Sequence, residues 1–116
     1  MSTKKGIIYA ILVDEKFYIG ATTTTIEQRM ASHKSLSKNP CKKNSKLYDY
    51  INEVRGGWND IIYIIIEEIE CKSLRELENI EYKYIKLHIN DSNCLNKMQS
   101  VQQKYIIDRF KKKYKN

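Results

Sequence analysis

Apolar residues near the start of the chain occur in two short runs of strand length. The first is IIYAILV at residues 7–13 and the second is KFYIG at residues 16–20, with two acidic residues between them. Two such runs joined by a polar pair predict a β-hairpin that turns at Asp14 and Glu15. The register that follows pairs Val13 with Lys16, Ile11 with Tyr18 and Tyr9 with Gly20. Because side chains alternate between the two faces of a strand, both tyrosines then lie on one face as diagonal neighbours.

Capping signals predict the helices that follow the hairpin. Thr25 and Gln28 have the spacing of a capping box, so we expect a first helix from Thr25 to about Ser37. A second helix is expected from about Ser45 and is stopped by a pair of glycines at 56–57. This helix is expected to bury three apolar residues at helical spacing, namely Leu47, Ile51 and Val54.

The second half of the chain adds a strand and two helices. The β-branched run Ile61 to Ile66 has strand length and predicts a strand that is buried on both faces. Ser73 and Glu76 repeat the capping pattern and predict a third helix over about 74–88, and a final helix is expected from about Val101. The expected fold class is α+β, with a small three-stranded, mainly antiparallel sheet flanked by helices and a basic C-terminal helix.

Length and composition indicate one domain. The chain has 116 residues, and we expect a core over about 6–96 followed by a basic helical tail over about 97–116. No apolar run approaches the roughly 20 residues of a membrane span, and the start lacks the apolar core of a signal peptide. We therefore expect an intracellular protein, in the cytoplasm or nucleus, with no membrane partner. Cys41, Cys71 and Cys94 are far apart and odd in number, which favours reduced structural thiols.

The charge balance indicates a polyanionic partner. Lys and Arg number 21 against 14 Asp and Glu, which gives a net charge of +7. A small basic domain attracts polyanions through its summed field, and nucleic acid is the most common of these. The alternative is that basicity serves only solubility.

Two of the expected helices carry polar side chains among their inward-facing apolar residues. On a helical wheel His33 lies in the middle of the inward stripe and Arg29 on its margin. In the third helix Glu81 falls within the apolar stripe, whereas Glu78 falls on its edge. A buried carboxylate is costly unless it binds a cation, so Glu81 is either a salt-bridge partner of Arg29 or a metal ligand.

The two hairpin tyrosines allow two interpretations. Tyrosine is a favoured strand residue, and Tyr9 and Tyr18 together make an ordinary diagonal packing pair. Alternatively, Gly20 opposite Tyr9 leaves an open space beside the ring, where two phenols could orient a water molecule or a phosphate oxygen.

Taken together, these residues resemble the GIY-YIG nuclease family. The matching elements stand in the family's order: GIIY at 6–9, YIG at 18–20, Arg29 four residues before His33, Glu81 on the third helix, and Asn96. The resemblance covers roughly residues 6–96. In one departure Gly6 stands one residue further from Tyr9 than in the usual motif. Glu78 lies on the same helix as Glu81, but spacing and the helical wheel both favour Glu81.

The resemblance implies a metal-dependent DNA endonuclease that hydrolyses a phosphodiester bond in one step. It implies one divalent ion, Mg²⁺ or Mn²⁺, bound through Glu81, with Arg29 offsetting charge on the phosphate. Tyr9 would act as general base toward water, and Tyr18 would help to hold the water or the phosphate. A tyrosine is a poor base unless cations lower its pKa, so either Arg29 and His33 do this or His33 takes the proton.

The remaining predictions concern orientation and DNA contacts. Asn96 is expected to orient the site rather than react. Lys16 is a candidate cation, although an ordinary hairpin-tip lysine is the favoured interpretation, and the other DNA-binding candidates are Lys34, Lys111, Lys112 and Lys113. We expect weak sequence preference unless a homodimer or a protein partner supplies it. The rival function is a non-catalytic basic module that binds nucleic acid.

Overall fold

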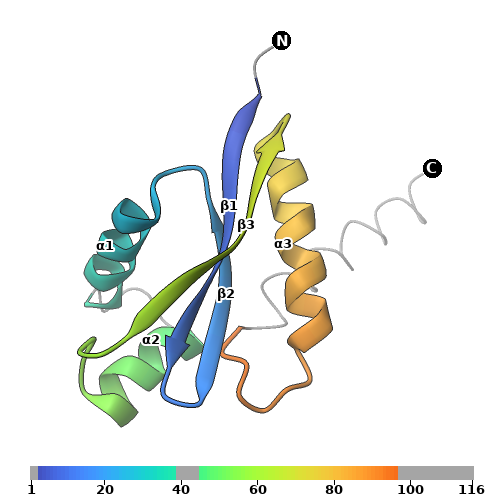
Figure 1. The fold of residues 1–116 in the computed structure, drawn as a ribbon. Helices are drawn as coiled ribbons and strands as arrows, with labels where there is room; N and C mark the ends of the chain where they lie inside the picture. The colour runs from blue at the N-terminus through green and yellow to red at the C-terminus, as the bar shows by residue number, and fades with distance from the viewer. Residues whose placement is uncertain (1–2, 39–44, 97–116) are drawn as a thin grey trace, which may run out of the picture.

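The sheet positions the other elements of the protein. The computed structural model describes residues 3–38 and 45–96, in which β1 spans Lys4–Val13, β2 spans Lys16–Thr22 and β3 spans Ile62–Cys71. The strand order is β2-β1-β3, and β1 pairs with both neighbours in the antiparallel sense (Figure 1). The expected α+β class with a small antiparallel sheet is confirmed.

The hairpin has the register expected from the sequence. Tyr9 lies opposite Gly20, Ile11 opposite Tyr18 and Val13 opposite Lys16. Asp14 occupies the left-handed region with φ 57, which aspartate tolerates better than most residues. Its carboxylate accepts a hydrogen bond from the Tyr50 hydroxyl, 2.7 Å away, so the turn is tied to the second helical segment.

Helices α1 and α3 begin at the predicted caps. Helix α1 spans Ile26–Ser37, and its Thr25–Gln28 capping box is complete. Helix α3 spans Leu74–His88, and the Ser73 side chain accepts a hydrogen bond from the Glu76 backbone. The expected C-terminal helix lies outside the described residues, and the division into core and tail remains a prediction.

The second helical segment departs from the predicted pattern. Helix α2 covers only Lys46–Asp49 and continues as a π-helical stretch, η1, over Tyr50–Arg55. Gly56 ends this segment in the left-handed conformation with φ 85, as the glycine pair predicts. The predicted burial of Val54 is wrong, because its side chain is 70% exposed. A π-helix bonds i to i+5, so the widened turn rotates Val54 out of line with Leu47 and Ile51.

Helices cover both faces of the sheet and form two cores. On one face α1 and α2 pack over β1, and the buried core there includes Tyr9, Met30, Leu47 and Ile51. Figure 1 shows α3 on the other face. The second core lies there and includes Ile8, Ile19, Leu77 and Ile85. The described helices include none that combines the length and apolar character of a membrane span. Cys71 and Cys94 are free and buried, as expected, and Cys41 lies outside the described residues.

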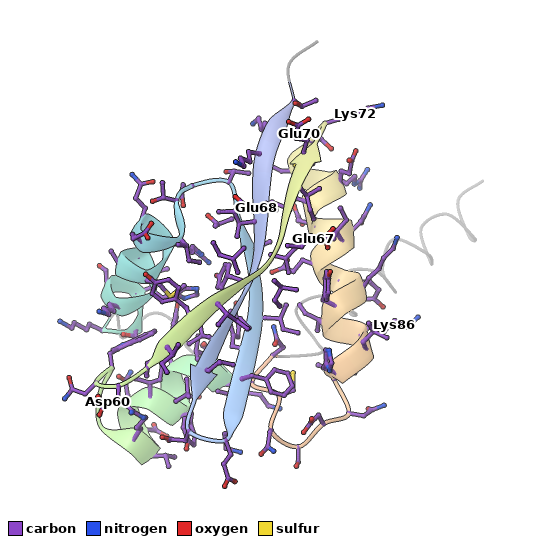
Figure 2. All side chains as sticks on the ribbon, in the orientation of Figure 1. Asp60, Glu67, Glu68, Glu70, Lys72 and Lys86 are labelled. Carbon is purple, nitrogen blue, oxygen red and sulfur yellow. The ribbon has the colours of Figure 1, made fainter. Side chains whose placement is uncertain are left out.

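The prediction that the isoleucine-rich strand is buried on both faces is wrong. β3 is an edge strand, and its isoleucines from 62 to 66 remain between 38% and 61% exposed. A continuous β-branched run reflects strand propensity as well as burial, so it does not distinguish an edge strand from a central one. Beyond these isoleucines, Figure 2 shows Glu67 on the α3 side of β3 and Glu68 on the opposite side.

A β-bulge interrupts the pairing of β1 with β3 next to Tyr9. Ile8 pairs with Glu67 and Tyr9 pairs with Ile65, which leaves Ile66 as the additional residue. Bulges bend a strand locally and change the direction of neighbouring side chains, and they are frequent beside functional sites. The bulge lies next to Tyr9, whose side chain is central to the candidate site described below.

Candidate active site

Tyr9 is the centre of a buried hydrogen-bond network. Its side chain is fully buried, and its hydroxyl lies 2.7 Å from Nε2 of His33. Nε of Arg29 donates a second hydrogen bond to the same hydroxyl over 3.1 Å. Arg29 and His33 are four residues apart on α1, so one face of the helix presents both groups to β1.

The ring of Tyr9 fills the space that Gly20 leaves. A Cβ atom at Gly20 would overlap with the Tyr9 hydroxyl, and it would lie 2.5 Å from the ring carbon that carries it. The expectation of an open gap beside the ring is therefore wrong. Glycine at this position makes room for the phenol itself, which then reaches Arg29 and His33.

His33 is enclosed by three tyrosines. Its side chain is 1% exposed, and its ring meets those of Tyr9, Tyr18 and Tyr48 edge-on at centroid separations between 5.7 and 5.9 Å. The second ring nitrogen, Nδ1, lies 2.8 Å from the Tyr48 hydroxyl. Burial, with a smaller contribution from Arg29, lowers the pKa of His33 to about 4. The imidazole is therefore neutral at physiological pH.

Burial also holds the tyrosines in their neutral form. It raises the pKa of Tyr9 to about 12, although the charge of Arg29 and its hydrogen bond act in the opposite direction. Burial likewise raises the pKa of Tyr18, with further contributions from Tyr9 and Glu81. At neutral pH Tyr9 is thus a phenol that hydrogen-bonds to a neutral imidazole.

Glu81 approaches this network from the other face of the sheet. It is a partly buried residue of α3, and burial is the main reason that its pKa rises to about 7, followed by the charge of Glu78. Arg29 and a hydrogen bond from the Ala21 backbone oppose this rise. Among the described side chains no ion pair joins Arg29 to Glu81, so the salt-bridge interpretation of this carboxylate is not supported.

The outer edge of β2 explains how a residue of α3 reaches the site. Phe17 exchanges backbone hydrogen bonds with Asn93 and Leu95, and two residues further on Ile19 bonds with the Asn96 side chain. Two residues beyond that, the Ala21 backbone hydrogen-bonds with Glu81. Alternate residues of a strand direct their backbone groups to the same edge. The carboxylate therefore lies at the rim of the sheet, between the α3 face and the face that carries Tyr9.

Asn96 fixes the position of β2. Its side-chain oxygen accepts a hydrogen bond from the Ile19 backbone over 2.9 Å, and its side-chain nitrogen donates to the Ile19 carbonyl over 2.8 Å. The residue is 4% exposed, and neither of these hydrogen bonds involves Tyr9 or His33. This arrangement agrees with an orienting role, since it holds the strand that bears Tyr18 and Gly20.

Glu81 offers a carboxylate ligand to a metal ion. Within residues 3–38 and 45–96, no three His, Cys, Asp or Glu side chains are grouped as metal ligands. Mg²⁺ is commonly held by one or two carboxylates and completed by substrate phosphates and water. Glu81 fits such an ion, because a nearby cation would favour the ionised form of a carboxylate whose pKa is about 7.

The DNA-binding candidates are placed only in part. Lys16 stands at the hairpin end, with its ammonium group 5.6 Å from the centre of the Tyr50 ring. Lys34 is exposed on α1. Lys111, Lys112 and Lys113 lie outside the described residues, so their role remains a prediction.

Sequence reasoning did not single out Tyr48. It lies one residue after Leu47 and three before Ile51, so the same helical wheel places it beside the inward stripe. Its burial was therefore foreseeable from the spacing. Its contact with His33 was not, because that depends on how α1 and α2 pack.

Comparison with models of known protein families identifies the domain. Residues 5–96 match the family model of the GIY-YIG catalytic domain. The chain belongs to the GIY-YIG family. No significant match was found among curated proteins or among solved structures. The matched range includes every described residue of the site, from Tyr9 to Asn96, and a GIY-YIG domain indicates a nuclease.

Proposed function

We propose that this GIY-YIG domain is a metal-dependent DNA endonuclease that hydrolyses phosphodiester bonds by one-step attack of water. The observation that carries the proposal is the buried Tyr9 hydroxyl, which is hydrogen-bonded to both Arg29 and His33 on one face of the sheet. Glu81 reaches the rim of the sheet from the opposite face. A domain that only binds nucleic acid has no need of a carboxylate kept in such a costly environment. The net charge of +7 favours association with a polyanion.

Tyr9 and His33 together account for proton removal from the attacking water. A phenol with a pKa of about 12 is not ionised at neutral pH, so its oxygen can take a proton from water only if it gives up its own hydrogen. Nε2 of the neutral His33 lies 2.7 Å away and can accept the phenolic proton as the Tyr9 oxygen takes a proton from water. The net result is one proton moved from water to His33. Tyr9 is then the group that touches the nucleophile.

The Arg29 guanidinium beside Tyr9 would offset negative charge on the phosphate. The Arg29 guanidinium hydrogen-bonds to the Tyr9 oxygen through Nε, which leaves its terminal nitrogens for a phosphate oxygen. Donors fixed in advance near developing negative charge usually contribute the largest part of such catalysis. Tyr18, whose ring packs against His33, would help to hold the water or the phosphate.

Glu81 would hold one divalent ion, Mg²⁺ or Mn²⁺. When bound, such an ion supplies Lewis-acid stabilisation of the phosphoryl oxygen. Asn96 would keep β2 in place against α3 during the reaction. The attacking oxygen would form the new P–O bond as the bond to the leaving oxygen breaks, and the leaving oxygen would take its proton from solvent water.

Incubation with supercoiled plasmid and MgCl₂ tests the proposal. We expect nicked and then linear DNA, and no product when EDTA replaces the metal. DNA binding is measured in parallel by fluorescence anisotropy. Binding without any nicked product in Mg²⁺ or Mn²⁺ would instead support the non-catalytic binding module.

A further inference from the structure

Tyr48 is the one member of the buried network to which the proposed reaction gives no role. It belongs to the first turn of α2, where its backbone N–H donates to the Ser45 side chain over 3.2 Å. Its side chain is 8% exposed, and its hydroxyl lies 2.8 Å from Nδ1 of His33. The two rings meet edge-on, 5.8 Å apart at their centroids. Buried polar networks make a site rigid when their members are satisfied by hydrogen bonds.

The direction of two of these hydrogen bonds depends on which ring nitrogen of His33 carries the hydrogen. Nε of Arg29 can only donate, so the Tyr9 oxygen accepts from it and keeps its own hydrogen available for His33. His33 is the other group to which the Tyr9 hydroxyl is hydrogen-bonded, so that hydrogen is fully used when it points to Nε2. A neutral imidazole with a hydrogen-bond acceptor at Nε2 carries its hydrogen on Nδ1. Nδ1 therefore donates, and the Tyr48 oxygen accepts.

Each arrangement leaves one hydroxyl hydrogen without a partner within this network: that of Tyr48 in the first case and that of Tyr9 in the opposite case. Tyr9 is fully buried, whereas Tyr48 is 8% exposed, so the unpaired hydrogen costs less on Tyr48. If Nε2 carried the hydrogen, the Tyr9 oxygen would accept from both Arg29 and His33, and the Tyr9 hydrogen would point away from both. Nε2 would then have no lone pair for a proton. The two ring tautomers thus differ in whether His33 can serve as an acceptor for Tyr9.

We infer that Tyr48 is a positioning residue, whose hydroxyl accepts the Nδ1 hydrogen of His33 and so keeps Nε2 free toward Tyr9. The inference deepens the proposed function and rests on it for its catalytic meaning. Tyr48 does not touch the substrate or the water, and it acts only through the imidazole. Its role corresponds to the orienting group of a nucleophile–base–orienter series, supplied here by a neutral phenol. A neutral acceptor also leaves the buried site without an additional negative charge.

The tautomer of His33 can be observed directly and without DNA. The chain contains two histidines, and the second, His88, is exposed at the end of α3, where it serves as an internal reference. In ¹⁵N-labelled protein at pH 7, long-range ¹H–¹⁵N correlation spectra distinguish a protonated ring nitrogen from one that bears a lone pair. We expect the Nδ1–H pattern for His33. The Nε2–H pattern in the wild-type protein would overturn the inference.

The Tyr48→Phe variant adds a kinetic test. It keeps the ring and removes only the acceptor, and we expect kcat to fall about 10- to 100-fold with KM for DNA unchanged, the range typical of groups that orient a functional histidine. The His33 spectrum should lose its pure Nδ1–H pattern. Tyr84→Phe is the matched control, because its hydroxyl donates to Glu67 on the surface, away from His33. That variant should retain the wild-type kcat.

The outcomes separate this inference from the proposed function. An inactive wild-type protein with the Nδ1–H tautomer would refute the nuclease proposal but support the role of Tyr48 toward His33. A folded, active Tyr48→Phe protein with wild-type kcat would overturn the role of Tyr48 and leave the nuclease proposal intact. If Tyr48→Phe fails to fold, the wild-type spectrum still decides the tautomer.

Discussion

The ring of Tyr9 lies across the backbone of Gly20, so the glycine of one strand determines where the phenol of the other can go. The two residues are direct partners in the hairpin. In such a pair the two side chains normally lie next to each other on one face of the sheet, and each occupies its own space. Here the Tyr9 ring takes the volume that belongs to its partner. The phenol thereby reaches Arg29 and His33 on α1.

Gly20→Ala should therefore impair cleavage far more than DNA binding. The added methyl group would overlap with the Tyr9 phenol, which would have to leave its bonds with Arg29 and His33. We expect the single-turnover cleavage rate to fall at least about tenfold. Gly6→Ala is a suitable control, because its methyl group would meet the ends of the flexible Leu77 side chain instead. Equal rates for the two variants would contradict a role for Gly20 in placing Tyr9.

Removal of single hydroxyl groups should distinguish the two tyrosines of the hairpin. Tyr9→Phe removes an oxygen that Arg29 and His33 both contact, whereas Tyr18 meets His33 through its ring. Tyr9→Phe should lower kcat by about 10²-fold or more, the usual contribution of an acid–base group. Tyr18→Phe should cause a smaller loss. Equal and mild losses in a plasmid-nicking assay would return both rings to the strand-packing interpretation.

The sequence predicted most of the fold because its local signals were strong and consistent. The caps at Thr25 and Ser73 and the two-residue turn after Val13 each specify an element boundary by a side-chain or backbone requirement. Short-range rules of this kind do not depend on the rest of the molecule. The register of the hairpin followed from its loop length, and the positions of Tyr9 and Tyr18 followed from that register.

The incorrect predictions concern features that depend on how the elements pack together. Edge and central strands have similar isoleucine-rich sequences, so the place of β3 depended on a strand order that pattern alone does not give. Val54 was misplaced because the π-helical turn changes the phase of the helix. The bulge beside Tyr9 and the contact of Tyr48 with His33 likewise depend on packing between elements.

For the candidate site, the helical wheel identified the inward-facing polar side chains but not their hydrogen-bond partners. His33 and Glu81 were recognisable because a polar residue in an apolar stripe is conspicuous. The hydrogen bond between Glu81 and the Ala21 backbone has no side-chain signal, because any residue supplies that backbone group. The same holds for the bonds between Asn96 and Ile19, which required the end of the loop to return to β2.

The stability of the protein should depend on pH through Glu81. Its pKa in the folded protein is about 7, against an ordinary value of 4.5, so the folded state binds the proton more tightly than the unfolded state. Between these values stability falls as pH rises, and the cost of the buried charge is fully present above pH 7. Without added metal, Glu81→Gln should raise the thermal midpoint relative to wild type at pH 8. This advantage should disappear below about pH 4.5.

A control for this measurement should make the same change in net charge elsewhere. Glu70→Gln removes a carboxylate from the exposed end of β3. The thermal midpoint of that variant should show no comparable gain at pH 8. At pH 4 Glu81 of the wild-type protein should be mostly protonated in both the folded and the unfolded state. A higher thermal midpoint for Glu81→Gln that persists unchanged at pH 4 would therefore contradict the claim that the buried charge of Glu81 lowers stability.

The cleavage rates of Glu81→Gln and Glu78→Gln, measured in single turnover with saturating DNA and Mg²⁺, test the central claim most directly. Both variants remove one carboxylate from α3, but that of Glu81 is partly buried and hydrogen-bonded to the Ala21 backbone, whereas Glu78 is exposed. Glu81→Gln should fall by at least about 10²- to 10³-fold, as expected when a main electrostatic group is lost. Glu78→Gln should stay within a few-fold of wild type. Wild-type cleavage by Glu81→Gln together with loss of cleavage in Glu78→Gln would show that the metal-binding carboxylate has been wrongly assigned.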